Sequence, residues 1–149
     1  MCNPNALFYQ QMVNANNAYW LNFFLKRDIN VMCWNYRGYG ESDKGWFTTL
    51  NPSRSKMDAE RVLAFVVNDL QIKGKIGIYG RSIGGITACH LAAKYSDLVS
   101  VLICDRTLNE LQGVSEHKFK GKATTYFFNL YTNGWRCQNA SNFSNKATQ

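Results

Sequence analysis

The feature that most constrains this chain is the segment Gly80-Arg81-Ser82-Ile83-Gly84-Gly85, which contains the pattern G-x-S-x-G. It follows a short apolar run, residues 75–79, and opens a helical stretch rich in small residues. In such a strand–turn–helix setting, the turn strains the serine backbone and lifts its hydroxyl clear of the sheet edge. Glycines beside the serine leave room where a Cβ would collide with the neighbouring strand or helix. The pattern therefore predicts a tight turn with Ser82 as a nucleophile.

A glycine-rich turn between a strand and a helix has two other interpretations, since it can bind a phosphate group or simply allow tight packing. A dinucleotide-binding fingerprint requires G-x-G-x-x-G, and a P-loop requires G-x-x-x-x-G-K-[ST]. Neither spacing occurs at residues 80–85. The spacing favours the nucleophile, and a nucleotide-binding βαβ domain is kept as an alternative.

The alternation of apolar runs along the chain predicts an α/β fold. Nearly continuous apolar runs are typical of strands in a parallel sheet that helices cover on both faces, which makes a three-layer sandwich. We expect strands at residues 29–34, 75–79 and 98–104. Helices are expected at residues 17–26, 52–70 and 83–95, and an aromatic-rich stretch at 124–131 is a further candidate.

The helix expected at residues 52–70 carries a clear start signal. Asn51 is suited to cap the helix, and Pro52 is suited to the first helical position, where its missing N–H is not needed. Apolar residues then recur at helical spacing and predict a buried stripe. The stripe consists of Ala59, Val62, Leu63, Val66 and Leu70.

Composition excludes several classes of protein. The 149 residues, 46% of them hydrophobic, fit one packed domain. No apolar run approaches the roughly 18 residues that a membrane span needs. The five cysteines show no C-x-x-C spacing, which predicts reduced buried thiols rather than a metal site. We therefore expect no metal, no cofactor and an intracellular location, either cytoplasmic or membrane-associated.

The net charge of +7 comes mostly from scattered basic residues, as on an ordinary solvated surface. Residues 117–122 form the one local basic cluster. A surface loop is the simpler interpretation of this cluster, and we expect no nucleic-acid partner. A peripheral contact with anionic lipid headgroups stays open.

Three segments resemble the α/β-hydrolase superfamily. Cys2-Asn3-Pro4-Asn5-Ala6 is similar to its oxyanion loop, residues 35–42 resemble the Asp-Tyr-Arg-Gly-x-Gly-x-Ser turn, and residues 79–85 resemble its nucleophile elbow. Residues 101–111 look like the segment after its sixth strand. Within the superfamily, the chain looks most like the serine aminopeptidase-like hydrolases and the phosphatidylserine-lipase branch. The resemblance implies an α/β-hydrolase fold that is incomplete.

The resemblance also implies a mechanism. Ser82 would attack the acyl carbonyl of a small-molecule or lipid substrate, as in an esterase, lipase or thioesterase. The oxyanion would be bound by the backbone N–H groups of Ile83 and Asn5. Pro4 stands where the resemblance leads us to expect glycine, and because proline has no N–H the second donor must lie beyond it.

A catalytic base and acid are harder to assign. His90 lies eight residues into the helix that follows Ser82, and its side chain cannot curl back, so we interpret it as structural. His117 follows Asp105 in the order of the superfamily, but it lies much closer to Ser82 than the family histidine does. Asp105 ends a strand, where some members carry their acid. For Asp105, loop capping or an association with Arg106 is the alternative role.

The resemblance further suggests that residues 1–149 are one partial domain. In the family, the strand before the oxyanion loop lies between the strands expected here at residues 29–34 and 75–79. The chain starts at the end of that strand, and its C-terminal acid and histidine region is absent from the pattern. We expect a parent protein that is a hydrolase and a fragment that is inactive alone. The alternative is a non-catalytic α/β-hydrolase-like protein.

Overall fold

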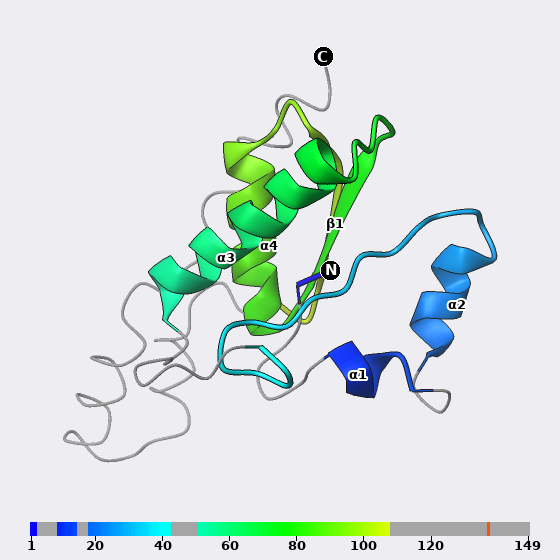
Figure 1. The fold of residues 1–149 in the computed structure, drawn as a ribbon, viewed down its shortest axis with the longest axis horizontal. Helices are drawn as coiled ribbons and strands as arrows, with labels where there is room; N and C mark the ends of the chain where they lie inside the picture. The colour runs from blue at the N-terminus through cyan, green and yellow to red at the C-terminus, as the bar shows by residue number, and fades with distance from the viewer. Residues whose placement is uncertain (3–8, 15–17, 43–50, 108–136, 138–149) are drawn as a thin grey trace.

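The computed structural model describes residues 1–2, 9–14, 18–42, 51–107 and 137. Within this part, two strands, β1 (Ile76–Arg81) and β2 (Val99–Asp105), pair in parallel. Helix α4 (Ile83–Lys94) connects them and packs on one face of the pair (Figure 1). The register runs from Gly77 opposite Val101 to Arg81 opposite Asp105. The strands expected at residues 75–79 and 98–104 and the helix between them are confirmed.

The other edge of β1 pairs with the N-terminus of the chain. The backbone N–H of Cys2 donates to the carbonyl of Tyr79 at 2.8 Å, and the N–H of Arg81 donates to the carbonyl of Cys2 at 3.3 Å. Cys2 thus forms a parallel bridge with Gly80. Strand β1 is therefore hydrogen-bonded on both edges where it ends, beside Ser82.

Helix α3 (Pro52–Ala64) begins where the sequence predicts. The Asn51 side chain accepts a hydrogen bond from the Arg54 N–H at 2.8 Å, and Pro52 is the first helical residue. Ala59 and Leu63 are buried, as expected.

The helix continues from α3 as a π-helical turn, η1 (Phe65–Asp69). A π turn holds one more residue than an α turn, so the residues after it face a different direction. Val67 joins Val62 in packing against the core, whereas Leu70 is 48% exposed. The prediction that Leu70 is buried is wrong for this reason.

Helices cover both faces of the strand pair, which confirms the α/β architecture. On one face, α3 and α4 bury the central apolar cluster. On the other face, α2 (Tyr19–Leu25) places Trp20 on Tyr79, with the two rings stacked at a centroid distance of 6.2 Å. The helix expected at residues 17–26 is confirmed as α2. The main cluster contains Cys2, Trp34, Tyr36, Ala59, Leu63, Ile78, Ala88, Leu91, Ala92 and Val99.

Residues 29–34 do not form the expected strand, and this prediction is wrong for the described structure. A strand requires a neighbouring strand to pair with its N–H and C=O groups. Here the N-terminal ammonium group of Met1 donates to the carbonyl of Met32 at 2.7 Å. Figure 1 shows the N-terminus beside β1, so Met1 and Cys2 lie between this segment and the sheet.

Helix α1 (Tyr9–Met12) is a short turn before α2. The helix candidate at residues 124–131 and the basic cluster at 117–122 lie outside the described residues. No helix in the described ranges is long and apolar enough to cross a membrane.

Candidate active site

Ser82 occupies the turn between β1 and α4 in an unusual backbone conformation. Its φ is 53° and its ψ is −123°, and positive φ is uncommon for a residue with a side chain. Such strain persists only where the surrounding structure enforces it. The Ser82 N–H donates to the carbonyl of Asp105 at 2.9 Å, and the Gly85 N–H donates to the carbonyl of Ser82 at 3.0 Å. The end of β2 and the first turn of α4 thus hold Ser82 from both sides.

Two glycines allow the close packing around this turn. A Cβ on Gly80 would lie 2.6 Å from the Cβ of Ala88 and 2.6 Å from the carbonyl oxygen of Gly84. A Cβ on Gly85 would lie 1.8 Å from Oγ1 of Thr107, which follows β2. Both contacts are far below any van der Waals distance. The structure confirms the expectation that a Cβ beside the turn would collide with its neighbours, with α4 at Gly80 and with Thr107 at Gly85.

The first predicted oxyanion donor, Ile83, is the first residue of α4 and is buried. N–H groups in the first turn of a helix have no acceptor within the helix, and the positive end of the helix dipole lies there. The second predicted donor, Asn5, lies outside the described residues. Cys2, three positions before it, pairs with Gly80, which places the start of the predicted oxyanion loop next to the turn. Both assignments stay predictions.

Asp105 lies opposite Arg81 in the register and is bound by several groups. The Tyr79 hydroxyl donates to its Oδ2 atom at 2.8 Å, and the Arg81 Nε lies 3.4 Å from the same oxygen. The Arg106 Nε is farther away, 3.8 Å from Oδ1. Burial, together with the bond to this carboxylate, raises the pKa of Tyr79 to about 12. In the described structure, Asp105 ties the ends of β1 and β2 together with its side chain and its carbonyl.

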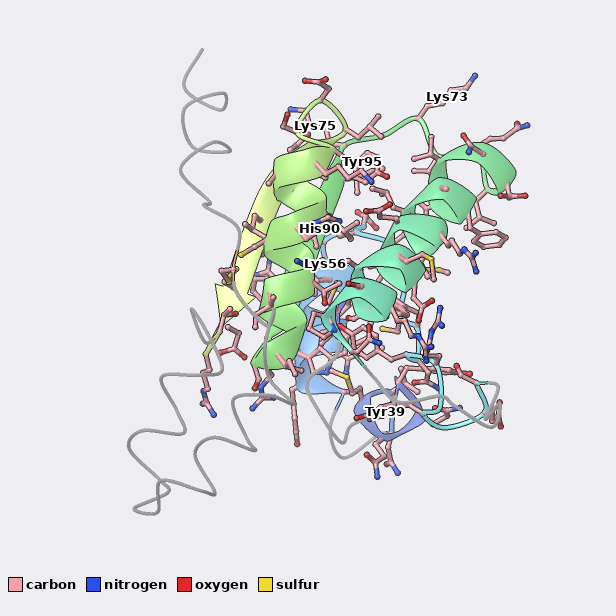
Figure 2. The ribbon with its side chains drawn as sticks, turned by 90° about the vertical axis from the view of Figure 1, so that its left-hand side faces the viewer. Tyr39, Lys56, Lys73, Lys75, His90 and Tyr95 are labelled. Atoms are coloured by element: carbon pink, nitrogen blue, oxygen red, sulfur yellow. The ribbon has the colours of Figure 1, made fainter. Side chains whose placement is uncertain are left out.

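His90 ties α4 to α3 rather than approaching Ser82. Its Nε2 atom lies 2.6 Å from Oε1 of Glu60, and Nζ of Lys94 donates to Oε2 of the same carboxylate at 2.8 Å. Burial acts to raise the pKa of Glu60, but the hydrogen bonds from Lys94 and His90 outweigh it and hold this pKa below its ordinary value. Figure 2 shows His90 between the two helices. This position fits the structural role expected from the sequence; His117 lies outside the described residues.

The turn at residues 35–42 is attached to α3. Gly38 and Gly40 adopt positive φ values of 78° and 55°, which other residues rarely do. Both ends of the Arg37 guanidinium bind the Asp58 carboxylate of α3, with Nε 2.8 Å from Oδ2. The structure therefore gives Arg37 a positioning role that the sequence pattern alone did not indicate.

Two features near Ser82 were not singled out from the sequence. Tyr79 and Arg81 form a carboxylate-binding pair on the β1 face opposite α4, and the only sequence signal is their i, i+2 spacing before the turn. The Thr107 hydroxyl is buried against Gly85 and has no hydrogen-bond partner within the described ranges. Among the described residues, no group of three His, Cys, Asp or Glu side chains is arranged to hold a metal ion.

The sequence of this chain is similar to those of several known proteins. The sequence profile of the alpha/beta hydrolase fold matches residues 12–135. An uncharacterized membrane protein of Saccharomyces cerevisiae, YNL320W, is 32% identical over 100 residues, which are 65% of this chain and 33% of that protein. Protein bem46 of Schizosaccharomyces pombe is 36% identical over 93 residues, which are 60% of this chain and 29% of that protein.

A bacterial relative matches in the same way. The uncharacterized protein YqkD of Bacillus subtilis is 32% identical over 106 residues, covering 68% of this chain and 34% of YqkD. The chain thus spans about a third of the length of these relatives. No solved structure gives a significant match. Since the family profile covers most of the sequence and the structure contains the expected order β1, α4, β2 around Ser82, this chain belongs to the α/β hydrolase fold family.

Proposed function

We propose that this chain contributes the nucleophile of a serine hydrolase that cleaves acyl esters or thioesters. The backbone of Ser82, with φ of 53° and ψ of −123° between a parallel strand and a helix, is the observation that carries the proposal. This conformation presents the Oγ atom at the end of the sheet, where it can attack a carbonyl carbon. The turn is then a nucleophile elbow. An acyl-enzyme forms as the alcohol or thiol leaves, and water releases the acid.

The oxyanion of the tetrahedral intermediate requires preorganised donors. The N–H of Ile83 supplies one at the start of α4, where the helix dipole also favours negative charge. The N–H of Asn5 supplies the other. Its place in sequence supports this, because the chain enters that loop directly from the bridge between Cys2 and Gly80.

The substrate class is a small-molecule or lipid acyl compound, with no cofactor and no nucleic-acid partner. The family supports hydrolysis, whereas the acyl-lipid assignment rests on the branch that the sequence resembles. An intracellular location with a peripheral membrane contact is part of the proposal; the name of one relative, an uncharacterized membrane protein, supports the membrane contact alone.

A non-catalytic α/β-hydrolase-like protein is the second candidate. One observation favours it. Within the described ranges the histidine is His90, and it binds Glu60 instead of the serine. An active enzyme then needs a general base for Ser82 that lies outside the described residues. The nucleotide-binding alternative is disfavoured by the family match.

The test is labelling with a fluorophosphonate, which forms an Oγ–P bond to an activated serine and releases fluoride. It is done on the longest natural chain that contains this sequence, comparing the wild type with Ser82→Ala and with Ser53→Ala, an exposed serine of α3. We expect labelling of the wild type and of Ser53→Ala, and none of Ser82→Ala. Labelling that persists in Ser82→Ala refutes the assignment. A folded wild type that is never labelled supports the non-catalytic candidate.

A further inference from the structure

Three cysteines that lie far apart in the sequence meet beside α4. Cys89 lies on α4 and is buried, and Cys104 lies on β2 opposite Gly80, on the face that α4 covers. The sulfur atoms of Cys89 and Cys104 are 3.7 Å apart, and those of Cys89 and Cys137 are 3.5 Å apart. None of the five cysteines forms a disulfide in this structure. Cys89 therefore stands in the middle of a cluster of reduced thiols.

Cys137 is anchored to the helix that begins at Ser82. It packs against Ile83 and Ile86, which form a small apolar cluster in the first turns of α4. Cys137 is itself half-buried, whereas Cys89 is buried. These contacts place the thiol beside the first turns of α4.

We propose that Cys89 and Cys137 form a reversible disulfide on exposure to a peroxide, which makes this cluster a redox modification site. A disulfide requires a sulfur–sulfur distance of about 2.05 Å, so the two atoms need to approach by roughly 1.5 Å. Cys137 is the nearer neighbour of Cys89, and rotation of its half-buried side chain supplies that movement; Cys104 is exposed, but its sulfur is farther from Cys89 and its backbone is held in the β1–β2 ladder.

The electrostatics favour Cys137 as the thiol that reacts first. A hydrogen bond with Cys89, opposed by burial and assisted by the Lys56 ammonium of α3, lowers the pKa of Cys137 to about 7. Figure 2 shows Lys56 beside α4. The thiolate is the nucleophile in such reactions. The hydrogen bond with Cys137, together with burial and the neighbouring thiols, raises the pKa of Cys89, so it remains a thiol until it meets an oxidised partner.

The reaction balances with hydrogen peroxide as the oxidant. The Cys137 thiolate forms a bond to one peroxide oxygen, the O–O bond breaks, and hydroxide leaves and takes a proton to become water. The Cys89 sulfur then attacks the sulfenic acid, the S–O bond breaks, and the hydroxyl leaves as a second water with the Cys89 proton. Two thiols lose two electrons and two protons, and one peroxide becomes two waters.

A metal site is the other use of clustered thiols, but the geometry does not favour it. Within the described ranges, no three such side chains are placed to share an ion. Two successive sulfur contacts centred on Cys89 form a chain rather than a cage. A pairwise bond is the chemistry that this arrangement supports.

The test is peptide mapping after treatment of the protein with a small excess of hydrogen peroxide. Remaining thiols are blocked with N-ethylmaleimide, and trypsin then places the three cysteines in separate peptides, residues 82–94, 95–106 and 137–146. We expect an intramolecular link between peptides 82–94 and 137–146, with the loss of two hydrogen atoms from the intact mass, which dithiothreitol reverses.

Variants separate this site from general oxidation. Cys33→Ser should leave the link unchanged, whereas Cys137→Ser should remove it. Finding only a link between peptides 82–94 and 95–106, or no link of 82–94 to 137–146 in the folded wild type, overturns the proposal. The readout does not depend on hydrolase activity, so it stands apart from the test of Ser82.

Discussion

Strand β1 and residues 29–34 are both short apolar segments, yet their surroundings differ. β1 is hydrogen-bonded to β2 along its length and to Cys2 at its end. Residues 29–34 receive the Met1 ammonium at the Met32 carbonyl and have no ladder in the described structure. Ile78 of β1 is 6% exposed, whereas Ile29 at the start of the other segment is 46% exposed, and Trp34 at its end is the residue that joins the core cluster. An apolar run becomes a strand only when a partner satisfies its backbone groups.

The turn that carries Ser82 is held more tightly than segment 29–34. The turn at Ser82 is held by β1, β2 and α4 together, so its strained backbone is enforced by three elements. Segment 29–34 leads into the turn at residues 35–42, which is attached to α3 by the Arg37–Asp58 ion pair and by the buried Tyr36. The most constrained part of the molecule is therefore the part that carries the proposed nucleophile.

The largest effect should come from breaking the contact between β1 and α4. Gly80→Val places a side chain where even a Cβ meets Ala88 and the backbone of Gly84 at 2.6 Å. We expect a loss of about 3 kcal/mol or more in the free energy of unfolding, at or above the top of the usual range for overpacking, because the atoms in the way include backbone. Urea unfolding followed by circular dichroism measures it. Gly74→Val is the matched control, since a Cβ there meets nothing within 4 Å; an equal loss in both variants contradicts the explanation.

Two isoleucine-to-alanine substitutions test whether β1 is packed more firmly than residues 29–34. Ile78→Ala should lower the free energy of unfolding by about 2–5 kcal/mol, because it opens a cavity in the core between β1 and α4. Ile29→Ala should lower it by less than about 1 kcal/mol, because that side chain is already in contact with water. The same urea experiment checks both. Equal losses would mean that residues 29–34 are packed as firmly as β1.

A smaller effect is expected from the carboxylate between α3 and α4. The pKa of Glu60 is held below its ordinary value of 4.5, so the folded state binds fewer protons than the unfolded state as the pH falls. Its stabilising contribution is fully present above that value and is lost as the pH falls through the folded pKa. We expect the urea concentration at the midpoint of unfolding to fall as the pH drops through this acidic range. This fall should be smaller than the one that Ile78→Ala causes.

Glu60→Gln is the control for this pH effect, because it keeps the shape but cannot titrate. Its urea midpoint should depend less on pH between about 6 and 3 than that of the wild type. Identical pH profiles for the two proteins would show that the contacts with His90 and Lys94 do not stabilise the fold.

The least perturbing experiment compares two cysteines, one from each region. Cys33 lies in segment 29–34, and burial raises its pKa, whereas the pKa of Cys137 beside α4 is about 7. At pH 7 we expect iodoacetamide to modify Cys137 about tenfold faster than Cys33, because more of it is thiolate. Quenched time points and peptide masses give both rates. Similar rates would show that Lys56 and Cys89 do not stabilise the Cys137 thiolate.

Local signals in the sequence were sufficient for the centre of the molecule. The pattern at residues 80–85 predicted the strand, the turn and the helix, because a serine placed directly between a strand and a helix needs a tight turn and the flanking glycines leave room for it. Asn51 and Pro52 predicted the start of α3 for a similarly local reason, since capping involves only the next few residues. Family membership also followed from short motifs, and the profile match confirmed it.

Tertiary structure alone decided the features that depend on distant partners. Residues 29–34 have strand-like composition, but composition does not supply the neighbouring ladder. The π turn η1 brings Val67 to the core and leaves Leu70 exposed. The binding of Asp105 by Tyr79 and Arg81, and the meeting of Cys89, Cys104 and Cys137, join residues that are far apart in the chain. Local sequence determines which backbone conformations are inexpensive, whereas pairing and packing in space determine which of them acquire partners.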